Sequence, residues 1–402
     1  MPPDGDRPRR IVVVSDFCDG AVAPGHIPSI EEAAAAWRSG ERGPGPDETH
    51  GRAGLHPPDV VGGYLERLPL AAVRHGLCDA AEIWTFWAQP SPPPCTFDQP
   101  ALTRRAFRPD DPFLRPFSSA DMLGHIAAFG PPDILCVWGL GVDEAILQAC
   151  VGSVRIYNSI DAPALRVPEE IGRHFDIILT GADWQSEEVE RRHPGMLTAV
   201  MPIGPEFASP ETFFPLDVEK TYDVIYVAAA QAYKKHDVLF DALAKLPRTI
   251  CALCVCGYGE LEHVLHARVH ELGIRVDFVG PPGVGFAEVN RLMNRARIGV
   301  VCGVDDGAPA ILTEYMLAGL PVLANARLRC GLQFITPLTG RMADEENFPA
   351  MLHEMLADID SFHPRETVMS NWIWPHTAER FARLVETCRE RKACFGHGVS
   401  LP

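Results

Sequence analysis

Short apolar runs alternate along the chain with stretches of helical spacing. In the first half, β-branched and apolar runs predict a series of strands, and apolar residues at helical spacing predict helices between several of them. The predicted strands are Arg10–Ser15, Ala81–Trp87, Asp133–Trp138, Val154–Ser159, Phe175–Thr180 and Leu197–Met201. The predicted helices are Val61–Gly76, Asp121–Phe129, Val142–Cys150 and Trp184–Arg192. This alternation is typical of a doubly wound α/β domain.

A second series of the same kind follows the segment Pro210–Lys220, which we interpret as a linker. Its predicted strands are Asp223–Ala229, Thr249–Cys256, Arg275–Val279, Arg297–Cys302 and Pro321–Ala324. Its predicted helices are Val238–Leu246, Glu260–Leu272, Phe286–Ala296 and one that begins at Pro309. Two consecutive strand–helix series predict an α/β protein with two doubly wound, Rossmann-like domains facing a central cleft, which is the natural place for a ligand.

We place the first domain at residues 1–215 and the second at residues 216–370. Residues 371–402 form a C-terminal helix and tail that we expect to cross back to the first domain, because Thr377–Arg389 is amphipathic and follows an aromatic anchor. Two insertions interrupt the first series. Gly40–Gly63 is rich in glycine, proline and charge and predicts a surface excursion, whereas Pro90–Pro116 is proline-rich and aromatic and predicts an irregular segment.

Composition excludes several classes of function. The 402 residues carry a formal charge of −17, which argues against a nucleic-acid-binding surface and against adhesion to anionic lipid. The sequence contains neither an apolar stretch long enough to cross a membrane nor the apolar segment of a secretion signal, so we expect a cytoplasmic protein. Most of the 12 cysteines lie in apolar runs, and we interpret them as small buried residues rather than metal ligands.

The most informative chemistry surrounds two carboxylates, Asp306 and Glu314. A predicted strand runs into an acidic, glycine-containing turn with Asp306, and the helix that follows contains Glu314 and ends at Gly319. Backbone N–H groups at the start of a helix attract anions, and carboxylates accept hydrogen bonds from hydroxyls. A ligand with phosphate and sugar hydroxyls would suit this arrangement at the carboxyl edge of a sheet. The alternative is structural, with Asp306 as a helix cap and Glu314 as a solvated residue.

Three motifs together resemble the donor-binding half of retaining GT-B glycosyltransferases, specifically glycosyltransferase family 4. The first is the pair Asp306 and Glu314, with Asp in the first place instead of the usual Glu. The second is Lys234-Lys235-His236-Asp237, which resembles the Lys-Gly-His-Asp segment of that family. The third is Gly257-Tyr258-Gly259-Glu260, and the similarity extends over Tyr222–Leu323.

The resemblance implies a nucleotide diphosphate sugar as the donor substrate, with no separate cofactor and no metal. It implies catalytic roles for Lys234 at the diphosphate and Asp306 at the sugar, and it places Glu314 at the ribose. In the acceptor half, the residues expected to face the cleft are Asp161, as a further catalytic candidate, and Gly20. The remaining residues expected at the donor are Gly257, Gly259, Gly307, Ala308, Pro309 and Ala310.

The function implied is metal-independent, hexosyltransferase-like transfer of a sugar to a hydroxyl-bearing acceptor, either a small molecule, an oligosaccharide or a natural product, with retention of configuration. Two departures from the family keep alternatives open: Ala229 stands where an arginine is usual, and Pro309 stands where glycine is frequent. They are compatible with a catalytically degenerate, nucleotide-sugar-binding partner subunit, and a GT-B epimerase is a further alternative. The motifs leave the base, the sugar, the acceptor and the oligomeric state unspecified.

Overall fold

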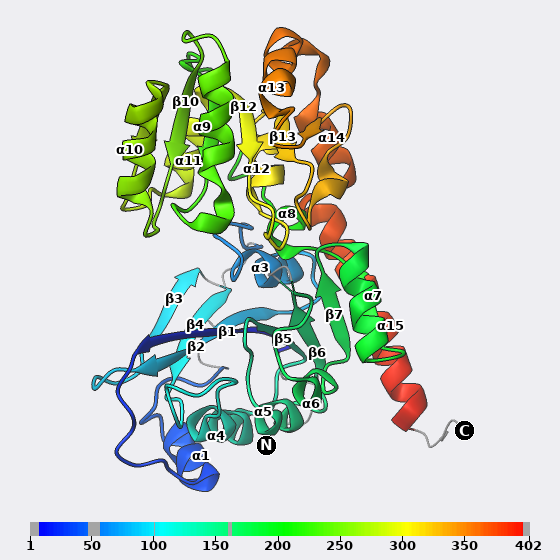
Figure 1. The fold of residues 1–402 in the computed structure, drawn as a ribbon. Coiled ribbons are helices and arrows are strands. Elements are labelled where there is room, and N and C mark those ends of the chain that lie inside the picture. The colour runs from blue at the N-terminus through cyan, green and yellow to red at the C-terminus, as the bar shows by residue number, and fades with distance from the viewer. Residues whose placement is uncertain (1–7, 47–56, 100, 160–162, 397–402) are drawn as a thin grey trace. The chain divides into compact units, whose positions relative to one another are not determined.

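The computed structural model describes residues 8–46, 57–99, 101–159 and 163–396, and the chain divides into two compact units (Figure 1). The first unit comprises Met1–Met201 together with Thr377–Pro402, and the second comprises Pro202–His376. Each unit is an open sheet covered by helices. The predicted fold class, an α/β chain with two doubly wound, Rossmann-like units, is confirmed.

The first unit is built on an eight-stranded sheet with the order β3-β4-β2-β1-β5-β6-β7-β8. All neighbouring strands are parallel except β3 and β4, which are antiparallel. The strands are β1 (Arg10–Gly20), β2 (Ala80–Ala88), β3 (Cys95–Gln99), β4 (Leu102–Phe107), β5 (Ile134–Trp138), β6 (Val154–Asn158), β7 (Ile177–Thr180) and β8 (Leu197–Val200). The helices are α1 (Ile30–Arg38), α3 (Arg67–Arg74), α4 (Ala120–Phe129), α5 (Glu144–Ala149), α6 (Glu169–Gly172), α7 (Asp183–Arg192) and the long α15 (Ile373–Gly396), which enters this unit at Thr377.

Side chains that point to one face of this sheet form a buried apolar core. Val12 and Val14 of β1 share one face of the sheet, where they join a buried cluster with Trp84 of β2 and Leu135 of β5. Side chains of α1, α4 and α5 complete the cluster. The central strands are therefore buried and read as continuous apolar runs, as expected for parallel strands with both faces covered.

A buried ion cluster lies within this apolar layer. Glu82 of β2 is 2% exposed and accepts hydrogen bonds from Arg105 Nε of β4 at 2.9 Å, from Arg10 Nη1 of β1 at 3.4 Å and from Trp84 Nε1 at 2.8 Å. Burial alone would raise the pKa of the Glu82 carboxyl, but the guanidinium groups of Arg105 and Arg10 outweigh it and hold the pKa well below its usual range. Glu82 thus joins three strands through charge.

The second unit has a six-stranded, all-parallel sheet with the order β11-β10-β9-β12-β13-β14. Its strands are β9 (Tyr222–Val227), β10 (Cys251–Val255), β11 (Arg275–Val279), β12 (Ala296–Val301), β13 (Val322–Asn325) and β14 (Gly340–Ala343). Its α-helices are α8 (Ile203–Glu206), α9 (His236–Lys245), α10 (Glu262–Leu272), α11 (Phe286–Asn294), α12 (Ile311–Leu317), α13 (Phe348–Ala357) and α14 (Pro364–Asn371). Short 3₁₀ helices are η1 (Ala232–Lys234), η2 (Leu332–Phe334) and η3 (Ile359–Ser361).

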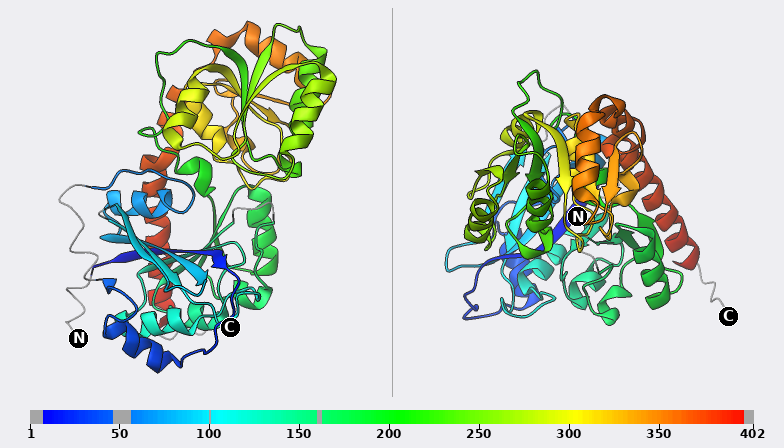
Figure 2. Two further views of the ribbon diagram at one scale, coloured as in Figure 1. Left: turned by 90° about the vertical axis from the view of Figure 1, so that its left-hand side faces the viewer. Right: turned by 45° about the horizontal axis from the view of Figure 1, so that its top comes forward.

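Helices cover both faces of this sheet (Figure 2). One apolar cluster contains residues of α11, α12 and α14, and a separate cluster contains residues of α9, α10 and α13. The sheet lies between the two clusters, so its strands are buried on both sides. Among the described residues, no helix combines the length and the apolar character that crossing a lipid bilayer would require.

Several local elements differ from the sequence prediction. The segment Pro90–Pro116 is not irregular throughout, because it contains the β3–β4 ribbon that extends the sheet beyond β2. Helix α1 was not predicted, although Ser29 and Glu32 form a capping box at its start. Strand β1 continues to Gly20 instead of ending at Ser15, because its last residues pair with β2 after an irregularity.

Candidate functional site

The candidate site lies at the carboxyl edge of the sheet in the second unit. From β9 the chain builds outward through β10 and β11, and it then returns to place β12 on the other side of β9. The strand order therefore reverses between β9 and β12. In open α/β sheets, ligands bind beside the carboxyl ends of the strands at such a switch point. The connections that follow β9, β10 and β12 contain most of the predicted donor residues.

The β9–α9 connection positions Lys234. The hydroxyl of Tyr226, a buried residue of β9, donates a hydrogen bond to the carbonyl oxygen of Lys234 at 2.6 Å. Lys235 follows in the left-handed conformation, with φ of 49°, and caps the start of α9. The ammonium group of Lys234 lies 4.7 Å from the centre of the Tyr233 ring, which is within the range of a cation–π contact. The backbone and the ring thus restrain the lysine.

Lys234 and Asp306 are in contact. The lysine Nζ forms a charge-assisted hydrogen bond with a carboxylate oxygen of Asp306, and the two side chains are only 16% and 13% exposed. One residue follows β9 and the other follows β12, so the pair spans the switch point. Water screens partly buried charges less than exposed ones. Two residues that the sequence nominated separately therefore form one electrostatic unit.

The turn Gly257–Gly259 lies against the same connection. Ala230 N donates to Tyr258 O at 2.7 Å, and Leu261 N donates to Ala230 O at 2.9 Å. Gly259 has φ of +131°, and a Cβ there would lie 2.3 Å from Ala230 O. Only glycine fits this position without displacing the loop that carries Lys234. At Gly257, a Cβ would meet only Gly283, at an ordinary 3.5 Å.

The β12–α12 connection contains Gly307, Ala308, Pro309 and Ala310. Gly307 forms an isolated parallel bridge with Cys330, and the buried Ala308 has φ of 73°. The helix begins at Ile311 and not at Pro309 as predicted. Pro309 instead lies in a tighter turn, because its carbonyl accepts a hydrogen bond from Leu312 N, three residues on.

Helix α12 buries Glu314 and is fixed to β9. All its residues are buried, and Glu314 itself is 7% exposed. The hydroxyl of the next residue, Tyr315, accepts a hydrogen bond from Val227 N at 2.7 Å and donates to Ile225 O at 3.3 Å. Gly299 of β12 leaves room for the Tyr315 ring, since a Cβ there would lie 2.4 Å from it. Glu314 is therefore held on the helix that follows Asp306.

His236, the first residue of α9, is a neutral neighbour of Lys234. It is 2% exposed, its Nε2 lies 3.8 Å from Cys256 Sγ, and its Nδ1 has no hydrogen-bond partner among the described residues. Burial, assisted by the positive charge of Lys234, lowers the pKa of His236 from 6.5 to about 4. The imidazole is therefore neutral in the folded protein at neutral pH.

Acid is expected to destabilise the second unit through His236. The unfolded chain binds a proton near pH 6.5 whereas the folded chain resists protonation until about pH 4, so the stabilising contribution is complete above the first value and is lost as the pH falls to the second. A difference of this size corresponds to about 3 kcal/mol. Urea unfolding at a series of pH values should show a shallower pH slope in His236→Gln than in the wild type. The control is His270→Gln, on exposed α10, and equal slopes in all three proteins would contradict the assignment.

The predicted residues of the first unit are less directly placed. Gly20 ends β1 with φ of +88°, and a Cβ there would lie 2.5 Å from Ala88 O, so its glycine is explained by close strand packing. Asp161 lies outside the described residues. A residue that the sequence analysis did not single out is Asp16, whose carboxylate accepts a hydrogen bond from Leu140 N at 2.8 Å. Its position at the end of a buried strand was the available signal.

The potential metal ligands are dispersed. Within the ranges that the structure describes, no group of three or more histidine, cysteine, aspartate or glutamate side chains is arranged to hold a metal ion. All twelve cysteines are free thiols, and eight of them are buried, in keeping with their interpretation as small core residues.

Part of the second unit is similar to a known protein family. Residues 209–355 match the glycosyl transferases group 1 family. A curated relative from Campylobacter jejuni, GalNAc-alpha-(1->4)-GalNAc-alpha-(1->3)-diNAcBac-PP-undecaprenol alpha-1,4-N-acetyl-D-galactosaminyltransferase, is 26% identical over 117 residues. The matched segment covers 28% of this chain and spans about a third (32%) of the relative. The match to the group 1 family includes Lys234, Asp306 and Glu314.

Solved structures resemble the chain over nearly its full length. Sucrose-phosphate synthase from Thermosynechococcus elongatus has a TM-score of 0.66 at 15% identity, covering 95% of this chain and 100% of that one. HepE of Anabaena, in complex with UDP and glucose, has a TM-score of 0.60 at 13% identity, covering 94% and 100%. The lipopolysaccharide outer core galactosyltransferase WaaB has a TM-score of 0.57 at 15% identity, covering 95% and 99%. At these identities the likeness establishes the GT-B type of fold, and the family match supports a glycosyltransferase.

Proposed function

We propose that this protein is a retaining glycosyltransferase that moves a sugar from a nucleotide diphosphate sugar to a hydroxyl-bearing acceptor. The observation that carries the proposal is the contact between Lys234 and Asp306 at the switch point of the second sheet. It lies inside the segment that matches the group 1 glycosyl transferases. The carboxyl edge of the sheet is a favourable place for a ligand. The lysine suits the negatively charged diphosphate of a sugar diphosphate, and the aspartate suits the hydroxyl groups of its sugar.

Lys234 is the proposed diphosphate cation. Its ammonium group has three donors, so it can keep its bond to Asp306 while it donates to a phosphate oxygen. The neighbouring Lys235 forms an ion pair with Glu345, and Ala229 provides no positive charge where the family usually has an arginine. Departure of the nucleoside diphosphate concentrates negative charge on its terminal phosphate, so a fixed cation lowers the barrier.

Asp306 has two proposed tasks. One carboxylate oxygen accepts from Lys234 and so directs the lysine, while the remaining acceptor capacity is available to hydroxyl groups of the donor sugar. Glu314 is proposed to accept from the ribose hydroxyls. The turn Gly257–Gly259 and the segment Gly307–Ala310 are proposed to form the backbone wall of this site.

The proposed reaction uses neither a covalent enzyme intermediate nor a metal. The acceptor hydroxyl attacks on the face from which the phosphate leaves, and a phosphate oxygen takes the proton of that hydroxyl. The contribution of the protein is then positioning together with stabilisation of the diphosphate charge. Because a phosphate oxygen takes the proton, this scheme requires no general base among the residues that we assign to the donor.

We propose that the acceptor binds to the first unit. Support comes from a cavity of about 270 Å³ in that unit, formed by β1, β2 and the β3–β4 ribbon. Its lining includes Phe17, which is 61% exposed, as well as Trp87 and Arg104. Aromatic faces and a guanidinium group suit stacking and hydrogen bonding with a hydroxylated ring. Asp161 remains a proposed catalytic residue of this half.

The direct test combines donor screening with analysis of the product. UDP-, GDP- and dTDP-linked sugars are incubated with a panel of hydroxylated acceptors, and the anomeric configuration of any product is determined by NMR. Retention is expected, whereas inversion would refute the proposed stereochemistry. Tight nucleotide binding without turnover over the whole panel would instead favour the partner-subunit alternative.

Two adjacent aspartates provide the matched variants for that test. Asp306→Asn should abolish most of the activity because it removes the charge that directs Lys234. Asp305→Asn should retain it, since the Asp305 side chain is 68% exposed and its ion pair with Arg329 is a loose one, at 3.9 Å. Equal loss in both variants would indicate a general effect of loop charge and would remove the special role of Asp306.

A further inference from the structure

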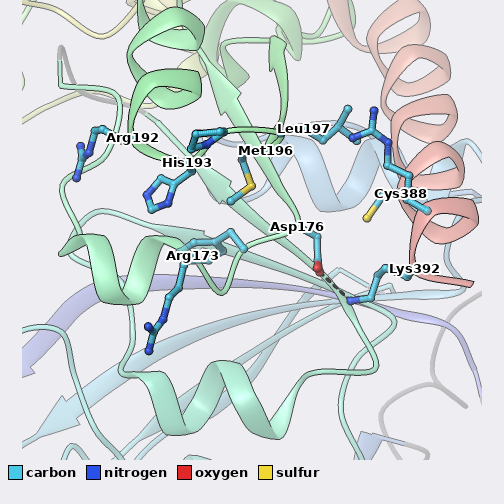
Figure 3. A pocket seen from close by; sticks show the side chains of 12 residues that line it. Arg173, Asp176, Arg192, His193, Met196, Leu197, Cys388 and Lys392 are labelled. Carbon is cyan, nitrogen blue, oxygen red and sulfur yellow. Dashed lines mark hydrogen bonds and ion pairs between the residues drawn. The ribbon is translucent and has the colours of Figure 1, made fainter. Parts of the chain in front are cut away.

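A second cavity lies in the first unit, away from the carboxyl edge of its own sheet (Figure 3). It has a volume of about 450 Å³ and is formed by the residues before β7, the turn between α7 and β8, and the last turns of α15. These segments include the amino ends of β7 and β8. The cavity is thus at the edge of the sheet opposite to the one expected to serve the transfer reaction.

Positive charge dominates the lining. Arg173, Arg192, Arg391 and Lys392 line the cavity together with a single carboxylate, Asp176. This local excess of cations occurs in a chain with a formal charge of −17. A cluster of like charges in a concave site repels itself and attracts counter-ions. The electrostatic pattern therefore indicates an anionic ligand.

The carboxylate of Asp176 is already neutralised. It accepts a hydrogen bond from Arg155 Nη2 at 3.0 Å. It accepts another from Lys392 Nζ at 2.9 Å (Figure 3). Burial would raise the pKa of Asp176, but its bonds with Arg155 and Lys392 lower it. Lys392 also donates to the carbonyl oxygens of Val151 and Ser153, which occupies its three donors and fastens α15 to the unit.

The arginines retain donors for a ligand. Arg173 and Arg192 form loose ion pairs, with Glu144 at 3.5 Å and Glu188 at 3.7 Å, and Arg192 Nη1 also donates to the carbonyl oxygen of Leu165 at 3.5 Å. Arg391 forms no hydrogen bond or ion pair within the described part of the chain. Each guanidinium group carries five N–H donors in a planar fork, a geometry that matches phosphate oxygens.

His193 is a buried residue in the wall of this cavity. The residue is 8% exposed, and its Nε2 has no hydrogen-bond partner among the residues that the structure describes. That atom packs against Gly172, where a Cβ would lie 2.8 Å from it, so the glycine makes room for the imidazole. Figure 3 shows His193 on the same side of the cavity as Arg173 and Arg192.

The size and the remaining walls narrow the ligand class. A cavity of this volume exceeds what a single inorganic anion needs, and Phe175, Met196 and Leu197 add apolar surface beside the cations. We propose that this pocket binds a small phosphate-bearing molecule at a site separate from the donor and the acceptor. Because α15 contributes Arg391, the bound phosphate would also tie the C-terminal helix to α7 and β8.

The test is calorimetric titration with inorganic pyrophosphate. The protein carries Lys234→Ala throughout, so that the proposed donor site contributes little to the signal. Arg391→Ala is expected to weaken binding at least tenfold, which corresponds to about 1.4 kcal/mol. The matched control is Arg383→Ala on the same helix, whose side chain is 63% exposed and pairs with Glu379; it should leave the affinity unchanged.

Three results would overturn the proposal: no heat of binding at millimolar pyrophosphate, undiminished affinity in Arg391→Ala, or an equal loss in Arg383→Ala, which would indicate non-specific attraction. A second variant, Arg173→Ala on the other wall, guards against a local effect on α15, and it should weaken binding to a similar degree. Circular dichroism of each variant establishes that the fold is retained.

Discussion

Replacing Lys234 by alanine is expected to lower kcat/KM for sugar transfer by about 10²–10³-fold, equivalent to about 2.7–4 kcal/mol of barrier. The variant removes the one cation that we assign to the leaving diphosphate, and it leaves the carboxylate of Asp306 without its partner. The second effect adds to the first, because an uncompensated, partly buried negative charge would repel the phosphates. Steady-state kinetics with the preferred donor measure the loss.

A matched lysine separates this effect from a change in net charge. Lys245→Ala, at the exposed end of the same helix α9, alters the net charge equally and should keep activity within about twofold of the wild type. Comparable activity of the Lys234→Ala variant and the wild type would contradict the proposed role. A rise in KM with unchanged kcat would mean that Lys234 binds the donor without favouring the transition state.

Replacing Glu82 by alanine is expected to destabilise the first unit by about 3–5 kcal/mol. The carboxylate is 2% exposed and lies between two guanidinium groups, those of Arg10 and Arg105, which are 1% exposed. Its removal leaves two buried positive charges without their common partner and takes away the acceptor for Trp84 Nε1. Urea unfolding by circular dichroism measures the loss, and hydrogen exchange of the β1 and β2 amides assigns it to this unit.

An exposed ion pair in the same unit serves as the control. Arg9 and Asp79 form hydrogen bonds as short as 2.8 Å, but their side chains are 49% and 38% exposed. Asp79→Ala is therefore expected to cost less than about 1 kcal/mol. A similarly small effect of Glu82→Ala would contradict the view that burial makes the carboxylate indispensable to its two arginines.

The alternation of strands and helices could be predicted from the sequence, because parallel strands buried on both faces consist of continuous runs of apolar residues. It also nominated Asp306, in the acidic turn after such a run, whereas Lys234 was nominated by the resemblance to a family. Predicting the contact between them would have required the strand order, which places β9 beside β12 although β10 and β11 intervene in the chain. Periodicity contains no information of that kind.

Other features were hidden for local reasons. Proline-rich flanks obscured the short strands β3 and β4, whose pairing depends on β2. The left-handed conformation of Ala308 breaks the preference of its residue type and is held by its surroundings. The basic cavity is lined by residues from 173–197 and from 388–392. Because these two stretches are far apart in the chain, neither of them alone predicts the cavity.

We propose that the carboxyl edge of the second sheet binds the nucleotide diphosphate of the donor. Hydrogen–deuterium exchange with and without the preferred nucleoside diphosphate is the decisive measurement. We expect slower exchange in peptides covering residues 229–237, 257–261 and 303–315, and loss of that protection in Lys234→Ala. Protection confined to peptides of the first unit, or unchanged by the Lys234 substitution, would contradict it.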